Sequence, residues 1–505
     1  QLMFFGIMLS ASVIFSQTVT GTVTGDDGPL PGVSVLEKGT NNGSTTDFDG
    51  KYSINLTKSD AVLAFSYVGF TSQEVAVNGQ SVVNVVLKVD AQALDEVVIV
   101  GYGSQTKKEV TSSIVQLDAK EFNKGVVNST AQLLQGKVAG LTISNRGSDP
   151  NSNGVIRLRG LSTIGANTEP LVVIDGLIGG SLDNVDPNDI KTINVLKDGS
   201  AAAIYGSRGS SGVILVTTKK GSSSKASFDY SSQIETSSVA NAVSVMNASQ
   251  FVAAGGFDLG STTDWMKEVT RTASTVVNNF AISGGSDNTN YRISANTRNV
   301  QGILKKSGFD QLNTRANINT KILNDKVDVS FNTSYTRKNS QFGFNEALRY
   351  AVLYNPTAPI LGVDSPFTFN GEQYGGYFEA LGLFDSFNPA SIVNQNKNDG
   401  KSTVFNYGLN LKTKISENLS VNFSTSEETS KRDNIEYYPI TSHFRGMASS
   451  ATRKGLAKFY HSDFKVQQIE GYGTYKKDFD KSHLTVVGGY SFQQTNFFDH
   501  FFQLG

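Results

Sequence analysis

The stretch LKDGSAAAIYGSRGSSGVILVTTKKG, residues 196–221, separates two parts of the chain that differ in their sequence pattern. Its glycines at 206, 209 and 212 permit backbone conformations that other residues resist, which is typical of a compact turn. The β-branched run that follows, Val213–Thr218, predicts a strand buried on both faces. We therefore expect a tight turn beneath a buried strand, with a small α/β domain before it and alternating strands after it.

The region before this stretch, from Thr111, alternates short apolar runs with turn signals, which predicts a small α/β domain. Strands are expected at 112–117, 141–144, 155–158, 171–174 and 192–196. Helices are expected at 119–121 and 130–137. A further short helix should begin at Asp186, whose side chain can cap the first turn.

The region from Lys225 onward alternates apolar and polar residues, which is typical of strands with one apolar face. In residues 327–335 the apolar face carries Val327, Val329, Phe331, Thr333 and Tyr335, and the polar face carries Asp328, Ser330, Asn332 and Ser334. The same alternation occurs at 291–298, 405–412 and 419–426. A single strand of this kind fits a soluble sandwich, whose apolar face meets a core, and a membrane barrel, whose apolar face meets lipid.

The spacing of these strands distinguishes the two architectures. Nine strands are expected, starting near residues 226, 275, 290, 309, 326, 402, 418, 463 and 483, each roughly 10–13 residues long. Long connections are expected at 237–274, 339–401 and 432–462, and a medium one at 301–308. They alternate with short turns such as Asn324-Asp325 and Glu417-Asn418. Short turns at one end and long loops at the other favour a transmembrane β-barrel.

The number of strands bears on how much of the barrel this sequence covers. Nine is odd, whereas single-chain bacterial barrels have even strand counts. A barrel wide enough to enclose another domain needs about 22 strands. We therefore expect the sequence to contain under half of a barrel.

The long connections are rich in aromatic residues. They include Phe342, Phe344, Tyr350, Tyr354, Phe367, Phe369, Tyr374, Tyr377, Phe384 and Phe387. Such rings can serve as platforms for sugar rings or peptide side chains, and they can equally pack a loop into a fold of its own. Both interpretations stay open.

Residues 196–221 closely resemble the end of the plug domain of SusC/RagA-like TonB-dependent outer-membrane transporters. The segments LLQGKVAGL, RLRGLSTIG and PLVVIDG resemble other parts of that plug. The resemblance implies a plug domain at 104–221 and a barrel from 225 to 505. It also implies plug signature residues, namely Arg159, Gly160, Asp175, Gly176, Tyr205, Gly206, Arg208, Gly209 and Gly212.

Three arginines of this region, Arg157, Arg159 and Arg208, invite two interpretations. They could form an anion site. Inside a polar barrel we expect them instead to pair with acidic side chains on the barrel wall. A phosphate loop at 206–212 is excluded, because the Lys-Ser/Thr pair that completes a Walker motif is absent.

The beginning of the sequence predicts an exported protein. Residues 1–16 contain the only long apolar run, which is too short for a membrane-spanning helix and fits a signal peptide whose first residues are missing. Residues 17–89 predict a small β domain, and PGVSVLEKGTNNGSTTDFDGKYSI with FSYVGF resembles the carboxypeptidase-regulatory-like β-sandwich. Residues 47–50, DFDG, have too few carboxylates for an EF-hand calcium loop, and we interpret them as a hairpin turn.

Residues 94–103, LDEVVIVGYG, form an extended apolar segment flanked by acids and glycines. Such a segment can add as a strand to the sheet edge of a partner, and it can equally be an internal strand between two domains. It resembles the TonB box of the family. The resemblance assigns TonB binding to Asp95, Glu96, Val97, Val98, Ile99, Val100, Gly101, Tyr102 and Gly103.

Composition excludes several classes of function. The net charge of −1 offers no basic surface of the kind that binds nucleic acid, so no such partner is expected. The lack of cysteine excludes disulfides, thiolate catalysis and cysteine zinc sites. The histidines at 443, 461, 483 and 500 show no metal-type spacing, and no hydrolase motif such as HExxH occurs. No metal, cofactor or catalytic residue is therefore expected.

The resemblance implies a Gram-negative outer-membrane protein that is mainly β, with a β-sandwich, an α/β plug and an antiparallel barrel. TonB, energised through ExbB and ExbD, would pull on residues 95–103 and rearrange the plug. A SusD-like lipoprotein would form a lid, and the imported ligand would be an oligosaccharide or, in some members, a peptide. Outer-membrane lipid would surround the barrel, and transporter–lid pairs could dimerise.

Two other functions stay open at this point. One is a surface adhesin or glycan-binding β protein that does not transport and does not depend on TonB. The other is a secreted enzyme, suggested only by the regulatory-like domain and disfavoured by the lack of a catalytic motif.

Overall fold

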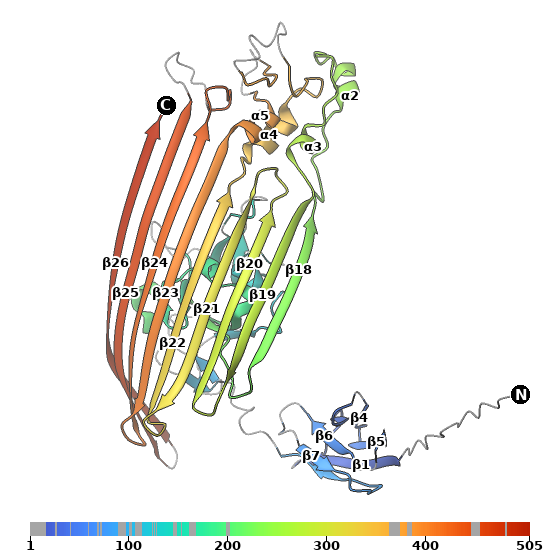
Figure 1. The fold of residues 1–505 in the computed structure, drawn as a ribbon, viewed down its shortest axis with the longest axis vertical. Helices are drawn as coiled ribbons and strands as arrows, with labels where there is room; N and C mark the ends of the chain where they lie inside the picture. Colours follow the sequence, from blue (N-terminus) through green and yellow to red (C-terminus); the bar gives the residue numbers. More distant parts are fainter. Residues whose placement is uncertain are drawn as a thin grey trace, which may run out of the picture. The chain divides into compact units, whose positions relative to one another are not determined.

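The structure, a computed structural model, describes most of the chain, and Figure 1 shows its ribbon. The described residues are 17–25, 28–40, 42–58, 60–67, 70, 73–88, 97–99, 104–106, 114–123, 125, 127, 129–144, 149–152, 154–160, 168–197, 203–362, 374–380, 386–445, 455–479 and 482–505. The chain divides into two compact units, one of residues 1–98 with 104–111 and one of residues 99–103 with 112–505.

The first unit is a small β-sandwich. Its strands are β1 (Gln17–Gly25), β2 (Gly28–Pro29), β3 (Ser34–Glu37), β4 (Gly43–Thr45), β5 (Lys51–Leu56), β6 (Val62–Ser66), β7 (Gln73–Ala76) and β8 (Val85–Val86). One sheet has the order β2-β1-β5 with β8 beside β1, and the other has the order β4-β3-β6-β7. Alternate residues of both sheets, such as Val19 and Ile54 from one and Val35 and Phe65 from the other, pack into one apolar core.

The segment at 47–50 is a tight turn, as expected, but the hairpin prediction is wrong, because the turn leads from β4 in one sheet to β5 in the other. The carboxylate of Asp47 accepts hydrogen bonds from the backbone N–H of Asp49 at 3.0 Å and of Lys51 at 2.8 Å. The side chain of Asp47 therefore closes the turn, in the manner typical of aspartate in tight turns.

The segment that resembles a TonB box lies mostly outside the described residues. Within it, β9 (Val97–Ile99) pairs with β10 (Ser104–Thr106) in a two-stranded sheet. Residues 94–96 and 100–103 are not described.

The second unit begins with a small domain that we call the plug. Its strands are β11 (Ile114–Asp118), β12 (Leu141–Ser144), β13 (Val155–Leu158), β14 (Leu171–Ile174), β15 (Leu177–Ile178), β16 (Ile190–Leu196) and β17 (Val213–Thr218). Its 3₁₀ helices are η1 (Thr130–Leu134), η2 (Leu182–Asn184), η3 (Pro187–Asp189) and η4 (Ala203–Gly209). The main sheet has the order β11-β16-β17-β14-β15, and β12 pairs with β13 separately.

Strand β17 is buried on both faces, as its β-branched sequence predicts. On one face, Ile214 and Val216 belong to the larger apolar core of the plug. On the other face, Val213 and Leu215 pack with Tyr205 from the preceding turn. The strand is therefore the centre around which both layers of the plug assemble.

The turn beneath β17 is as tight as expected. Gly212 has φ +92°, and a Cβ atom added there would lie 2.2 Å from Cδ2 of Leu158 and 3.1 Å from the carbonyl oxygen of Leu196. Both the conformation and the close approach require glycine at this position.

Two helix predictions in the plug are wrong in part. Residues 119–121 form a turn rather than a helix. The helix expected at 130–137 is a short 3₁₀ helix that ends at Leu134, because Gln135 turns to extended backbone with ψ 121° and Gly136 follows at φ +73°. The short helix expected at Asp186 is confirmed as η3, and the Asp186 side chain accepts a hydrogen bond from the N–H of Asn188 at 2.9 Å.

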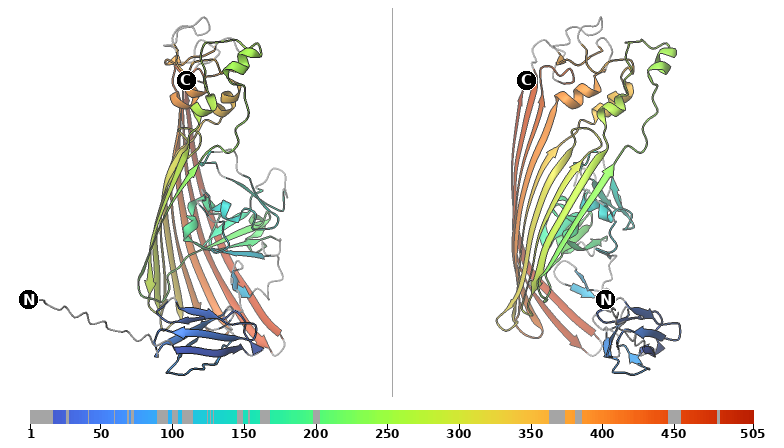
Figure 2. Two further views of the ribbon diagram at one scale, coloured as in Figure 1. Left: turned by 90° about the vertical axis from the view of Figure 1, so that its right-hand side faces the viewer. Right: turned by 45° about the vertical axis from the view of Figure 1, so that its right-hand side comes forward.

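The rest of the second unit is built on one antiparallel sheet, which we call the wall. Its strands are β18 (Ser227–Ser237), β19 (Ala273–Gly285), β20 (Thr289–Gln301), β21 (Gly308–Ile322), β22 (Val327–Gln341), β23 (Lys397–Lys414), β24 (Leu419–Tyr438), β25 (Leu456–Phe479) and β26 (Ser482–Leu504). They pair in sequence order, so the nine expected strands are confirmed. The plug lies against one face of the wall, and the long connections gather at one end (Figure 2).

The expected strand length of roughly 10–13 residues is wrong for the later strands. Strands β23 to β26 contain 18, 20, 24 and 23 residues. β24 and β25 continue through much of the connection expected at 432–462, and their pairing ends at Tyr438 and Leu456. Charged side chains there are paired across the strands, as in Glu436 and Lys458 at 2.9 Å, so a polar sequence does not interrupt the ladder.

The described residues of the long connections contain four short helices. These are α2 (Ala248–Ala253), α3 (Trp265–Val269), α4 (Glu346–Leu353) and α5 (Pro389–Gln395). Within the part of the chain that the structure describes, no helix is both long and apolar enough to cross a membrane.

Several aromatic residues of these connections form a core of their own. Phe344, Tyr350, Tyr354 and Tyr374 are buried, which supports the packing interpretation for these four residues. The rings of Trp265 and Tyr354 meet edge to face with centroids 5.0 Å apart. Phe342, Tyr377 and Phe387 are half-buried, and Phe367, Phe369 and Phe384 lie outside the described residues.

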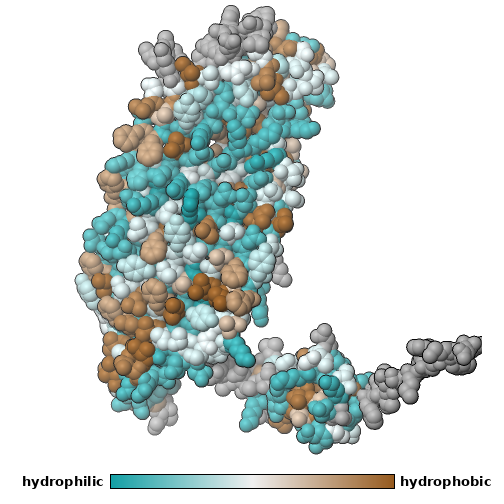
Figure 3. Space-filling view, in the orientation of Figure 1, coloured by the Kyte–Doolittle hydropathy of each residue, from teal (hydrophilic) through white to brown (hydrophobic). Residues whose placement is uncertain are grey.

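The outer face of the wall, away from the plug, carries exposed apolar side chains. They include Ile293, Phe331, Phe405, Phe423 and Ile469. Figure 3 views this face and shows hydrophobic residues gathered over the lower part of the strands, with hydrophilic residues dominating higher up. This pattern is that of a strand face that meets lipid along part of its length.

Candidate functional site: the plug and its seat on the wall

The plug is held on the wall by polar side chains that project from the inner face of the strands. The alternation that places Phe331 outward places its neighbours Asn332 and Ser334 inward. Hydrogen bonds and ion pairs then join inward side chains of β20, β21, β22, β25 and β26 to the plug.

Among the described residues, the most buried ion pair between wall and plug joins Arg298 of β20 to Asp186. Nε of Arg298 lies 2.8 Å from Oδ2 of Asp186, and the two side chains are 4% and 0% exposed. Nη1 of the same arginine donates to the carbonyl oxygen of Val127 at 2.6 Å. Because the other carboxylate oxygen of Asp186 caps η3, one aspartate both starts a helix and binds the wall.

A second acidic group, Asp189 at the end of η3, contacts the same strand. Its Oδ2 accepts a hydrogen bond from Nδ2 of Asn296 at 2.8 Å, and its Oδ1 lies 3.6 Å from Nη2 of Arg292. Burial raises the pKa of the Asp189 carboxyl, and the neighbouring guanidinium of Arg315 opposes that increase.

A third acidic group, Asp175, connects the wall to the central strand of the plug. Its carboxylate accepts hydrogen bonds from the N–H of Thr218 at 2.9 Å and from the Thr218 hydroxyl at 2.7 Å. Nη1 of Arg315 in β21 lies 3.4 Å from the same carboxylate. Asn317, two residues further along β21, donates to the Thr218 hydroxyl at 3.1 Å and to the carbonyl oxygen of Lys219 at 2.8 Å.

Further hydrogen bonds hold the plug at other points. Nδ2 of Asn151 donates to the carbonyl oxygens of Gly308 and Gln341, each at 2.9 Å. The Thr336 hydroxyl donates to the carbonyl oxygen of Asn184 at 3.3 Å. On the far strands, Gln468 of β25 accepts from the N–H of Ile178, and Gln493 of β26 accepts from Arg208.

These ion pairs have the opposite polarity to the one expected from the sequence. The acidic partners lie on the plug, and the arginines lie on the wall. Arg208, expected to pair with an acid, hydrogen-bonds the amide of Gln493 instead. The side chains of Arg157 and Arg159 are exposed.

The structure brings some of the signature residues together and separates others. Asp175 and Gly176 form the turn after β14 that contacts β21, while Tyr205, Gly206, Arg208, Gly209 and Gly212 form the turn beneath β17. Arg159 and Gly160 follow β13, where the N–H of Arg159 donates to the carbonyl oxygen of Gly140 at 2.7 Å.

Sequence reasoning missed most of the residues that seat the plug. Asp186 was expected only as a helix cap, and Asp189, Arg292, Arg298 and Arg315 were not singled out. The available signal was the inward position of the three arginines, since a charged residue on the polar face of a barrel strand faces whatever fills the barrel. Within the described residues, no group of three or more histidine and carboxylate side chains is placed to hold a metal ion.

Replacing Arg298 with alanine is expected to loosen the plug strongly. The change leaves the carboxylate of Asp186 buried without its cation, and removing one partner of a buried pair costs about 3–5 kcal/mol. The measurement is the free energy of plug unfolding, obtained by proteolysis of the membrane-inserted receptor at increasing urea concentrations.

Two further variants make this result specific. Arg298→Met combined with Asp186→Asn removes both charges and keeps a capping side chain, so it should recover most of the loss. Arg337→Ala changes an exposed arginine of β22 and should leave the plug unaffected. A plug that is equally stable in Arg298→Ala and Arg337→Ala would show that the pair does not hold the plug.

Comparison with known proteins shows which family the chain resembles. The CarboxypepD_reg-like domain matches residues 19–99, and the TonB-dependent Receptor Plug Domain matches residues 106–213. The TonB-dependent receptor P3 of Formosa agariphila is 32% identical over 98% of this chain and 50% of its own length. The TonB-dependent receptor SusC of Bacteroides thetaiotaomicron is 34% identical over 78% of this chain and 41% of its own length. The chain thus spans about half the length of the curated relatives it matches.

The fold has a close counterpart among solved structures. The RagAB peptide importer in its open-open state superimposes with a TM-score of 0.64 at 20% identity, over 81% of this chain and 50% of that chain. This likeness concerns the fold. The curated relatives are receptors rather than enzymes. Together, the two domain matches, these relatives and the plugged antiparallel wall identify the chain as an outer-membrane protein of the SusC-like TonB-dependent receptors.

Proposed function

We propose that the protein imports a large nutrient across the outer membrane, driven by TonB acting on residues 95–103. The observation that carries this proposal is how the plug is attached. Its seat on the wall consists of individual hydrogen bonds and ion pairs, such as Arg298 with Asp186 and Asn317 with Thr218. Water can replace each such contact when the plug moves, so the plug can leave its seat and return without exposing a large apolar surface.

The order of elements supports a route for the pulling force. β11, the first plug strand after residues 95–103, is the edge strand of the plug sheet and pairs only with β16 there. β16 in turn follows η3, whose Asp186 and Asp189 contact the wall. A pull on the TonB-binding segment would therefore act first on β11, then on β16, and through η3 on the ion pairs of the seat.

We assign TonB binding to Asp95, Glu96, Val97, Val98, Ile99, Val100, Gly101, Tyr102 and Gly103, with energy supplied through ExbB and ExbD. The short strand β9 supports this assignment, because Val97–Ile99 already adopts the extended conformation that strand addition to a partner requires.

We infer an oligosaccharide as the nutrient, with a peptide as the second choice, and a SusD-like lipoprotein as the lid over the barrel. The family resemblance described in the sequence analysis implies the first choice, while the name of the RagAB importer, similar in fold, refers to peptides. The packed loop core around Trp265 and Tyr354 supports a lid partner, because ordered loops offer a preformed docking surface at low entropic cost.

The alternative function is a surface adhesin or glycan-binding protein that does not transport. It would share the β-sandwich and the loops but would need neither TonB nor a movable plug. The polar seat of the plug favours transport, since a permanent plug gains more stability from apolar packing than from buried ion pairs.

Purification of the full-length receptor from detergent-solubilised outer membranes tests the proposal. Mass spectrometry is expected to find a surface lipoprotein in about equal amount, together with a bound glycan or peptide. Membranes from a strain that lacks the lipoprotein serve as the control and should yield the receptor without ligand. A receptor that purifies alone from wild-type membranes and carries no ligand would favour the adhesin.

A further inference from the structure

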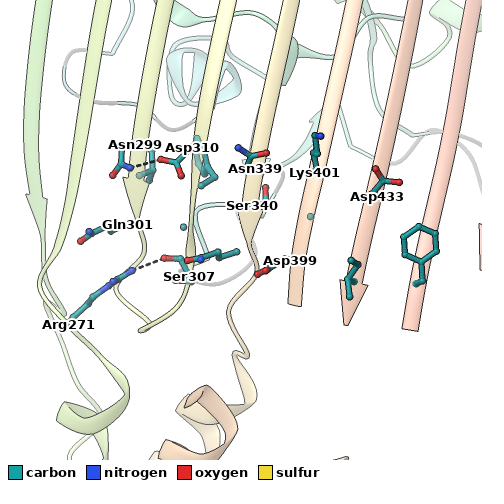
Figure 4. A pocket seen from close by; sticks show the side chains of 17 residues that line it. Arg271, Asn299, Gln301, Ser307, Asp310, Asn339, Ser340, Asp399, Lys401 and Asp433 are labelled. Atoms are coloured by element: carbon teal, nitrogen blue, oxygen red, sulfur yellow. Dashed lines mark hydrogen bonds between the residues drawn. The ribbon is translucent and has the colours of Figure 1, made fainter. Parts of the chain in front are cut away.

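A groove lined by both polar and apolar residues crosses the outer face of the wall, on the side away from the plug. Its volume is about 650 Å³. Five polar residues on adjacent strands form its floor, and each is the register partner of the next: Asn299, Asp310, Asn339, Lys401 and Asp433. Figure 4 shows these side chains in a row across the strands.

The groove has a defined edge on the side of the long connections. Gln301, Gln341 and Asp399 line it two residues further along their strands, and Ile435 and Phe459 continue that row. At one end, Arg271 closes the groove and donates to the carbonyl oxygen of Ser307 at 2.9 Å (Figure 4). It also donates to the carbonyl oxygen of Gly302 at 3.0 Å. The guanidinium is therefore held in place by the backbone.

The height of the groove above the apolar part of the outer face determines which layer of the membrane it faces. On β22 the groove residue Asn339 lies four residues beyond Tyr335, and on β23 Lys401 lies four residues beyond Phe405. Four residues span about 13 Å of strand, or about 10 Å of height for a strand tilted as in barrels. The headgroup layer of a bilayer extends roughly 5–8 Å beyond each side of the hydrocarbon core. Tyr335 and Phe405 are the last apolar residues on the outer face of these two strands before the groove, so the groove lies about 10 Å beyond the apolar band there, at the outer edge of the lipid headgroups.

The chemistry of the lining points to a neutral sugar. Amides and carboxylates supply donors and acceptors that suit hydroxyl groups, and the ring of Phe459, 36% exposed, offers an apolar face for a sugar ring. The three carboxylates of Asp310, Asp399 and Asp433 are matched by the cations of Lys401, Arg271 and Lys397, whose Nζ lies 3.1 Å from Asp399, and Asp433 also hydrogen-bonds Nδ1 of His461 at 2.6 Å. The cations are therefore matched by carboxylates and give the groove no strong preference for phosphate or other anions.

We propose that this groove binds the saccharide headgroup of a glycolipid in the outer leaflet. The groove opens on the lipid side of the wall, whereas a nutrient on its way inward would pass along the plug side. The proposal rests on the wall being a membrane barrel and does not depend on which nutrient is imported.

The test uses the full-length receptor extracted from its own outer membranes and examined by native mass spectrometry. Lys401→Ala with Asp433→Ala removes two hydrogen-bonding groups from the groove and is expected to lower the glycolipid-bound fraction about tenfold. Asn339→Leu is a second variant that changes no charge and should act in the same direction. Lys477→Ala with Asp478→Ala, at the other end of β25, is the matched control and should retain the glycolipid.

A second experiment distinguishes a saccharide that is part of a glycolipid from the same saccharide free in solution. The headgroup saccharide, released from the same membranes by mild acid, is added to receptor reconstituted in glycolipid-free nanodiscs. Weak binding of the free saccharide, with glycolipid retained by the wild type and lost by both groove variants, supports the proposal. Equal glycolipid retention in the groove variants overturns it, and so does tight binding of the free saccharide by a receptor that carries no glycolipid. Nutrient uptake should stay normal in the groove variants. Failure of the glycolipid proposal can therefore be told apart from failure of the import proposal.

Discussion

A receptor without residues 95–103 is expected to bind its nutrient at the cell surface and to import none of it. The segment provides the extended strand on which TonB is proposed to pull, and the plug cannot leave its seat without that force. A hydrogen bond to a charged group, such as that between Arg298 and Asp186, contributes about 1.5–3 kcal/mol net of its replacement by water, and the seat contains several polar contacts that must break together. Thermal motion alone would therefore open the plug too rarely to support uptake.

The measurement compares binding and accumulation of a labelled nutrient in cells that carry either form of the receptor. A matched control replaces the nine residues with a flexible segment of equal length, which keeps the spacing and removes the strand. The control should behave like the deletion. Undiminished uptake by the deletion strain would refute the role of TonB. The surface adhesin would then be the better-supported function.

A lysine at Phe331 or Phe423 is expected to prevent most of the receptor from inserting into the outer membrane. Both side chains are exposed on the outer face, at 38% and 42%. A lysine on the lipid face near the middle of the bilayer costs about 2–4 kcal/mol, which is a large share of the stability of a membrane barrel. The measurement is the fraction of receptor in the outer membrane that keeps its folded mobility on an unheated gel.

The structure selects the proper control for this experiment. Asn332 points to the plug side and lines a cavity of about 230 Å³ whose lining also includes the carboxylate of Asp175, so a lysine there should be tolerated. Asn422 also points inward, but it is 7% exposed and its amide hydrogen-bonds Asn410, so a charge there would be buried. Equal insertion of Phe331→Lys and Asn332→Lys would show that the apolar face does not meet lipid.

The sequence alone was enough to predict the nine strands, the buried strand β17 and the tight turn that requires Gly212. These features depend on local pattern. Alternation with a period of two marks a strand face, a β-branched run marks a buried strand, and glycine marks a backbone that other residues cannot adopt. Each signal lies within a few residues of the structure it predicts.

Only the tertiary structure decided where the charges meet. Arg298 and Asp186 are 112 positions apart, and Arg315 and Asp175 are 140 apart, so no local pattern links them. The sequence showed arginines in the plug and suggested that acids would line the wall, whereas the ion pairs have the opposite polarity. The lengths of β24 and β25 were missed for the same reason, since partners such as Glu436 and Lys458 compensate each other only after the strands align.

The sequence by itself therefore determined which segments become strands and which of their faces is apolar. The tertiary structure decided how the plug is attached and which aromatic residues of the loops are buried. The physical reason is that backbone preference and side-chain alternation are local properties of the chain. The free energy of an ion pair or a packed ring depends instead on burial and on a partner that only the folded chain brings within reach.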